Sequence, residues 1–312
     1  MRLLLKLFGS LLMWGIVACL LILIALLPRD VESHRVGYDD IMEYHFSWEA
    51  YEKNIKDYLK DVKVHKSLGT TAYEMPVETE MLHYGWRSAK VIFPALIISL
   101  IAGIFKGIYD YKHQSGFRRM FGKNATWLGQ SVPEFISIML IQTVLFEAGK
   151  YGFPDVDIYG DEQWYNIFLP ILFVSMYPAA IIARYTSEAI ENEDGRDYIL
   201  TARSKGIGDR TVLWRHTLRN CWPNLLQQSL PVMMTLLSGM FIVEFMSQYR
   251  GIGLRLVSAL HIKSSFMAGA PMPIDTSAVI GFILLFTLIL LITQWLTQIV
   301  SHFVNPVKRR AS

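Results

Sequence analysis

The residue types that most often carry chemistry are scattered along this 312-residue chain. No GxxxxGK[ST] phosphate loop, HExxH, CxxC or GxSxG pattern occurs in it. The eight histidines are dispersed, and the two cysteines, Cys19 and Cys221, lie far apart in or beside apolar runs. We therefore expect no enzyme, no nucleotide site of the chain's own and no cofactor or metal, and we interpret the cysteines as small packing residues.

Long apolar segments are the main structural elements that the sequence predicts. The chain is 52% hydrophobic and 18% charged, which excludes a disordered protein. No charged residue occurs between Phe8 and Leu27 or from Thr276 to Val307. Because a bilayer span needs about 20 apolar residues, the sequence predicts an all-α integral membrane protein. Its six predicted spans are roughly 8–27, 91–109, 129–148, 165–184, 223–246 and 276–300.

The distribution of charge predicts the orientation of these spans. Basic residues exceed acidic ones only on the side that holds both termini and the 184–222 segment. By the positive-inside rule, both termini and that segment face the cytoplasm. The first apolar run begins like a signal peptide, but Pro28-Arg29-Asp30 follows it without a small-residue cleavage pattern. We expect a retained anchor.

Four parts follow along the chain. They are an N-terminal transmembrane helix (1–27), an external segment (28–90), a five-helix core (91–307) with a cytoplasmic loop (184–222), and a basic cytoplasmic tail (308–312). In the external segment, apolar residues at three- and four-residue spacing predict an amphipathic helix over 47–62. They are Trp48, Tyr51, Ile55, Tyr58, Leu59 and Val62. This helix is either a cap over the spans or a surface for an external partner.

The cytoplasmic loop has an ordered pattern of its own. A helix is predicted from Arg196 to Lys205, and Gly206-Ile207-Gly208-Asp209 interrupts it. Gly206 suits a left-handed cap, and Asp209 suits the cap of a second helix, which we expect to end before Pro223. Tyr198, Ala202 and Lys205 fall on one helical face, where the small Ala202 would allow close approach of a partner. A helix–turn–helix of this kind favours a docking structure, whereas a basic helix held by anionic lipid is the alternative.

Three acidic residues lie in or near the predicted spans. Glu134, Glu147 and Glu244 all fall close to predicted span ends. An acid deep in a membrane is a functional hypothesis by default, but snorkelling or the interface would account for acids at span ends. We therefore expect no proton-relay chemistry from them.

The loop sequence resembles a known family. Asp197-Tyr198-Ile199-Leu200-Thr201-Ala202-Arg203-Ser204-Lys205-Gly206 is similar to the EAA-loop signature of ABC importer permeases, and most closely to the dipeptide/oligopeptide/nickel family. Val212-Leu213, Arg215-His216 and Leu218-Arg219-Asn220 resemble the continuation, and Ser67-Leu68-Gly69, Pro76-Val77 and Val243-Glu244 resemble other elements. The chain departs from the family pattern at two places. The family's Pro-Gly-Asp-Pro after the first span is replaced by Pro28-Arg29-Asp30-Val31, and its Pro-Gly-Leu-Gly is replaced by Arg250-Gly251-Ile252-Gly253.

The resemblance implies the type I architecture of six transmembrane helices in the bacterial plasma membrane. It also implies a transport subunit that forms half of a pathway with a second homologous permease. Separate ATPase subunits would bind the ATP, an external solute-binding protein would deliver a peptide or similar small solute, and no nucleic acid would be bound. ATPase coupling would fall to Asp197, Tyr198, Thr201, Ala202, Arg203, Lys205, Gly206, Arg215 and His216.

Two other functions stay open on the residues alone. A secondary transporter would need its own ion-coupling site, and the sequence offers neither paired intramembrane acids nor clear broken-helix signals. A membrane-anchored sensor or assembly protein would use the 28–90 segment to bind its ligand.

Overall fold

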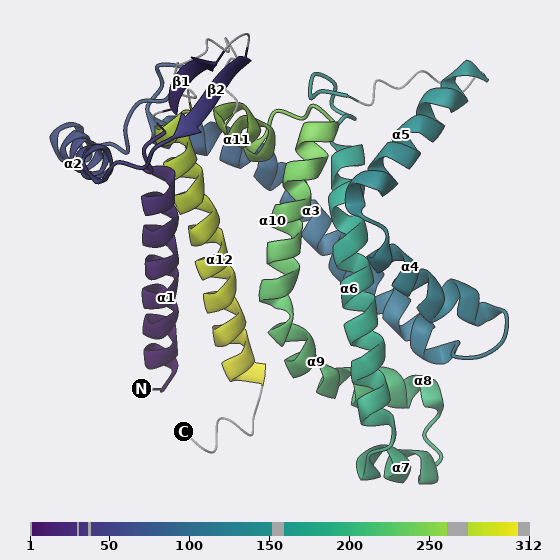
Figure 1. Ribbon diagram of the computed structural model, residues 1–312. Coiled ribbons are helices and arrows are strands. Elements are labelled where there is room, and N and C mark those ends of the chain that lie inside the picture. Colours follow the sequence, from purple (N-terminus) through teal and green to yellow (C-terminus); the bar gives the residue numbers. More distant parts are fainter. Residues whose placement is uncertain (1, 30, 37–38, 152–158, 261–273, 305–312) are drawn as a thin grey trace. The chain divides into compact units, whose positions relative to one another are not determined.

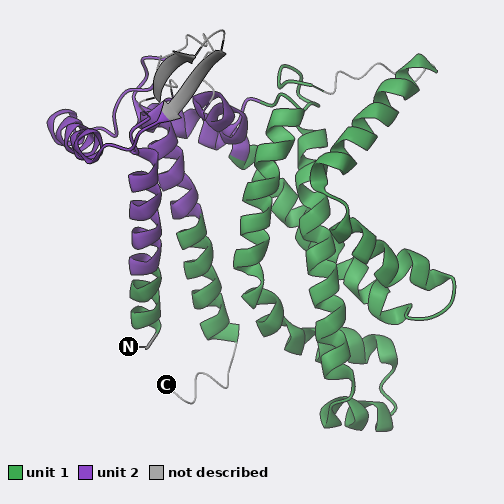
Figure 2. Cartoon of the chain, viewed as in Figure 1, with its two compact units in different colours: residues 1–10, 89–249, 290–312 green, residues 11–88, 250–289 purple. Residues whose placement is uncertain are grey.

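The computed structural model describes residues 2–29, 31–36, 39–151, 159–260 and 274–304. The chain forms two compact units (Figure 2). Unit 1 consists of residues 1–10, 89–249 and 290–312, and unit 2 consists of residues 11–88 and 250–289. Three of the long helices run from one unit into the other.

Five described helices are long and apolar enough to cross a membrane. They are α1 (Arg2–Ala25), α3 (Val77–Lys112), α6 (Phe168–Asp194), α10 (Ser229–Met246) and α12 (Thr276–Val304) (Figure 1). A broken pair of helices can supply a sixth span. The predicted helical membrane fold is confirmed. Helix α3 begins well before the predicted start at 91, because its first turns carry charged residues that a search for apolar runs leaves out.

The third predicted span, roughly 129–148, is not one straight helix but a bent pair of helices. The π-helix η1 (Met120–Asn124) and α4 (Ala125–Ser131) precede α5 (Glu134–Lys150), with a bend of 104° between the two parts. The cause is Pro133, because a proline disfavours helical geometry at the residue before it. Val132 is accordingly extended, with φ −84° and ψ 123°.

Helix α6 packs against α4, α10 and two of the four short helices that follow it in unit 1, η2 and α9. The four short helices are α7 (Asp197–Ser204), α8 (Asp209–Thr211), the π-helix η2 (Val212–Thr217) and α9 (Leu218–Gln227). The second loop helix was expected to end before Pro223, but Pro223 lies inside α9 and the break falls at Gln228. The predicted fifth span therefore starts later than expected.

Unit 2 contains a hairpin that the sequence did not predict. Strands β1 (Val31–Val36) and β2 (Asp39–Tyr44) pair antiparallel, with Val31 opposite Tyr44. Neither segment alternates apolar and polar residues, which is the pattern that predicts a strand. The expectation of an exclusively α fold therefore needs this small exception.

The helix predicted over 47–62 is present as α2 (Trp48–His65). Its N-cap is Ser47, whose hydroxyl accepts a hydrogen bond from the Ala50 amide. On its inner face, the Tyr51 hydroxyl donates to the Leu23 carbonyl at 3.0 Å and the Asn54 amide donates to the Leu26 carbonyl at 3.2 Å. These contacts with the end of α1 support the interpretation of α2 as a cap.

A buried ionic cluster holds the rest of unit 2 together. Arg255, on α11 (Ile252–Leu260), forms ion pairs with Glu80 and with Asp275, the latter at 2.6 Å. All three side chains are 2–3% exposed. The other oxygen of Asp275 accepts from the Ala278 amide at 3.1 Å and so caps α12. One guanidinium thus joins α3, α11 and the start of α12.

Candidate functional site

The candidate site begins with α7, which lies below the end of α6 in Figure 1. Its helical face at i, i+3, i+4 and i+7 is exposed. That outer face consists of Asp197, Leu200, Thr201 and Ser204. Leu200 is 53% exposed, although an apolar side chain gains from burial. We call these four residues the outer face of α7.

The turn after α7 is a Schellman motif, as two hydrogen bonds show. The Ile207 amide donates to the Ala202 carbonyl at 3.2 Å, and the Gly206 amide donates to the Arg203 carbonyl at 2.9 Å. Gly206 has φ +76°, a conformation that glycine adopts without steric cost. The prediction of a left-handed cap at Gly206 is confirmed. Lys205 precedes it as the exposed C-cap residue.

The inner face of α7 packs against the chain itself. Ile199 and Ala202 are buried with Val212, and Tyr198 and Ile207 pack around them. Tyr198 also donates its hydroxyl to Glu193; burial and this hydrogen bond raise the pKa of the Tyr198 hydroxyl. The expectation that Ala202 offers close approach to a partner is therefore wrong, since its methyl is already covered.

Two apolar clusters connect α7 to the membrane helices. Val212 belongs to the cluster under α7, while its neighbour Leu213 belongs to a second cluster. The second cluster joins the η2–α9 segment to the ends of α3 and α6 through Ile108, Ala189, Ile190, Leu218 and Cys221. Burial raises the pKa of the Cys221 thiol to about 12, so this cysteine is unreactive. The loop is thus packed onto the spans and is more than a flexible connection.

Arg203 fixes the loop electrostatically. Its guanidinium pairs with Asp194, at the end of α6, at 2.7 Å and with Asp209 at 3.3 Å. Asp209 was expected to cap the second helix, but it is the first residue of α8, and Gly208 occupies the N-cap position. Its carboxylate makes no cap hydrogen bond and turns to Arg203 instead. The charge of Arg203 is therefore used within the chain.

The other predicted coupling residues lie on α7 and η2. Thr201 donates its hydroxyl to the Asp197 carbonyl at 2.8 Å. Arg215 is exposed on η2 and His216 is half-buried there. Sequence reasoning missed Leu200, although the burial of Ile199 and Ala202 places it on the opposite side of the helix. The structure thus divides the predicted set into an inner, structural group and an outer group that a partner can reach.

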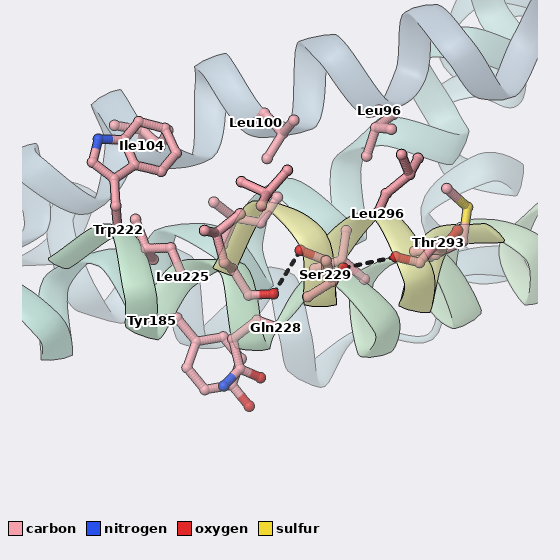
Figure 3. Close-up of a pocket in the computed structure, with 16 residues that line it drawn as sticks. Leu96, Leu100, Ile104, Tyr185, Trp222, Leu225, Gln228, Ser229, Thr293 and Leu296 are labelled. Carbon is pink, nitrogen blue, oxygen red and sulfur yellow. Dashed lines mark hydrogen bonds between the residues drawn. The ribbon is translucent and has the colours of Figure 1, made fainter. Parts of the chain in front are cut away.

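Unit 1 also encloses an apolar cavity of about 240 Å³ (Figure 3). Residues of α3, α6, α9, α10 and α12 line it, including Leu100, Trp222 and Leu296. Two of its hydroxyl groups donate to backbone carbonyls, Ser229 to Leu226 at 2.7 Å and Thr297 to Thr293 at 2.8 Å. Such a lining suits hydrocarbon and offers little to a charged or peptide-like solute.

The three membrane acids have different surroundings. Glu147 is exposed and pairs with Lys150 at 2.7 Å, while Glu244 is completely buried near the end of α10. Glu134 is half-buried, and its carboxylate lies against Gly239, in the middle of α10. The expectation that all three belong to span ends is wrong for Glu134, because the bend at Pro133 places α5 differently from a straight span.

Residues 95–305 match the family described as the binding-protein-dependent transport system inner membrane component. The chain belongs to this family. It is the permease subunit of an ABC importer in the inner membrane, and it is not itself an enzyme. The family excludes a secondary transporter despite the broken helix, and it excludes a sensor as the primary function.

Named relatives agree with this family. The dipeptide transport system permease protein DppB of Bacillus subtilis (strain 168) is 25% identical over 234 residues, which cover 73% of this chain and 69% of that protein. DppB of Lactococcus lactis subsp. cremoris (strain MG1363) is 28% identical over 208 residues, or 66% and 65%. The glutathione transport system permease protein GsiC of Escherichia coli (strain K12) is 25% identical over 225 residues, or 72% and 67%. The aligned part spans about two thirds of each relative.

A solved structure shares the fold. The MetNI methionine ABC transporter, in inward-facing conformations, superposes with a TM-score of 0.52 at 15% sequence identity. The match covers 72% of this chain and 96% of that chain. At this identity the likeness establishes the permease fold and carries no information on the solute.

Proposed function

We propose that this chain forms half of the pathway of an ATP-driven peptide importer and that its 197–220 loop couples it to a separate ATPase. The other half comes from a second homologous permease, and an external binding protein delivers the solute. The printed names of the relatives, which include dipeptide and glutathione permeases, support the peptide class.

The packing of the loop is the observation that carries the coupling proposal. A subunit without a nucleotide site must receive force through a contact that does not yield. Helix α7 meets this requirement, because one buried cluster fixes it to Val212 and a second fixes Leu213 to α3 and α6. A displacement of α7 is therefore transmitted to the spans.

The outer face of α7 is the proposed contact with the ATPase. Leu200 offers an apolar side chain, and Asp197, Thr201 and Ser204 surround it with polar groups. An exposed apolar centre with a polar rim is a common arrangement at protein interfaces. Arg203, Tyr198 and Ala202 act indirectly in this scheme, by holding the helix in place.

Leu200→Asp tests this contact without disturbing the loop, since the side chain is exposed. We expect the variant to insert normally and to bring down much less ATPase when the permease is purified from membranes. Leu59→Asp on α2 is the matched control, because Leu59 is 60% exposed. Full ATPase recovery with Leu200→Asp, at normal membrane abundance, would refute the assignment of this face.

A further inference from the structure

The carboxylate of Glu134 lies against the middle of α10, one of the helices long and apolar enough to cross a membrane. A Cβ atom placed on Gly239 would be 2.7 Å from its Oε2 atom, so the carboxylate touches the α10 backbone there. Gly239 is ten residues after Ser229 and seven before Met246. At about 1.5 Å per residue, the contact lies roughly 15 Å and 10 Å from the two ends of α10.

No basic partner compensates this charge within the described residues. Glu134 forms no hydrogen bond or ion pair with any side chain in the part of the chain that the structure describes, whereas Glu147 on the same helix is paired with Lys150. As the first residue of α5, Glu134 gains some stabilisation from the helix N-terminus. That effect explains how the acid is tolerated, but it supplies no counter-ion.

The carboxylate also borders a small cavity of about 70 Å³ between the broken helix and α6. Ser137 contributes a hydroxyl to the lining, and Phe173 and Tyr177 contribute aromatic rings. The cavity can hold a single small group and is too small for a whole peptide. A carboxylate beside hydroxyl oxygens and aromatic rings is the combination that binds an organic ammonium ion.

We propose that Glu134, with Ser137, Phe173 and Tyr177, forms a site for the ammonium group of the transported solute. A peptide with a free amino terminus carries such a group, so the site deepens the proposed function and rests on it. The break at Pro133 is what brings the acid to this depth. The solute's cation would supply the positive counter-charge that the Glu134 carboxylate lacks among the described residues.

The first test measures the charge at the site without any transported solute. Ser137→Cys is placed in the complete transporter, with Cys19→Ser and Cys221→Ser, and is treated during ATP turnover with a trimethylammonium-ethyl or a hydroxyethyl methanethiosulfonate. These reagents differ chiefly in charge. Adding Glu134→Gln should lower the ratio of the cationic to the neutral rate about tenfold, because residues at i and i+3 lie about 5–6 Å apart. Adding Glu147→Gln, the matched control, should leave the ratio unchanged.

An unchanged ratio with Glu134→Gln would overturn the proposal, and so would failure of both reagents to reach the cysteine. The second test is ATP-dependent uptake of dialanine, for which Glu134→Gln should raise KM about tenfold and Glu147→Gln should not. If dialanine is not transported at all but the rate ratio depends on Glu134, the peptide assignment fails while the ammonium site stands. If uptake is normal in both variants and the ratio is insensitive, the ammonium site fails while the importer remains.

Discussion

Replacing Gly206 by valine tests the turn after α7 without altering the membrane helices. Gly206 has φ +76°, and an added Cβ would meet no atom within 4 Å. The cost of the substitution is therefore backbone strain, roughly 1–2 kcal/mol for a left-handed L-residue. To escape the strain, the chain must give up two hydrogen bonds of the Schellman motif and move Ile207 out of its cluster.

A strain of this size lowers the ratio of correctly turned to wrongly turned loops by a factor of roughly 5–30. We expect ATP-dependent uptake into proteoliposomes to fall by up to this factor at unchanged membrane abundance, and Gly206→Ala to lie between wild type and Gly206→Val. Gly116 provides a matched control, since it has φ +72° and also no neighbour within 4 Å. Gly116→Val carries the same strain outside the coupling loop and should transport normally.

Two results would refute the reasoning about Gly206. Normal uptake by Gly206→Val would show that the turn does not position a coupling element. An equal loss with Gly116→Val would show that uptake responds to backbone strain in any loop on the cytoplasmic side. Ala202→Arg would be a less specific probe, because the structure buries Ala202 within the loop's own cluster.

Three further predictions concern topology, stability and thiol chemistry. A membrane-impermeant maleimide should label Lys60→Cys in intact cells but Gly208→Cys only after permeabilisation, and the reverse pattern would refute the orientation. Arg255→Ala should destabilise the purified permease by about 3–5 kcal/mol, because it leaves two buried carboxylates without their cation. The exposed control Arg210→Ala should change the stability by less than about 0.5 kcal/mol. Equal melting temperatures for the two variants would contradict the stabilising role of Arg255. Because its raised pKa lowers the thiolate fraction, Cys221 should react with a permeant maleimide at pH 8 at least about a hundredfold more slowly than Lys205→Cys, whereas comparable rates would show that the thiol is not buried.

The sequence predicted the features that depend on local chemistry. Apolar runs located the membrane helices. Gly206 predicted the turn after α7, because only glycine adopts a left-handed backbone conformation without steric cost. The bend at Pro133 carried a usable signal, because a proline within a predicted span disfavours helical geometry just before it. The position of Glu134 against the middle of α10 follows from this bend and not from the length of the apolar run.

Other features depend on contacts between distant segments. The inward direction of Ala202 is set by Val212 and Ile207, and the pairing of Arg255 with Glu80 and Asp275 joins three separate helices. Helical spacing alone placed Tyr198 and Ala202 on one face correctly. It could not decide whether that face meets a partner or the chain itself.

The coupling claim is tested most directly by a photo-crosslinking side chain introduced at position 200 in the assembled transporter. The account predicts adducts with the ATPase subunit from position 200, and none with it from position 59 on α2. A complex that retains ATP-dependent uptake but yields only lipid adducts, or none, at position 200 would contradict the proposal that the outer face of α7 contacts the ATPase.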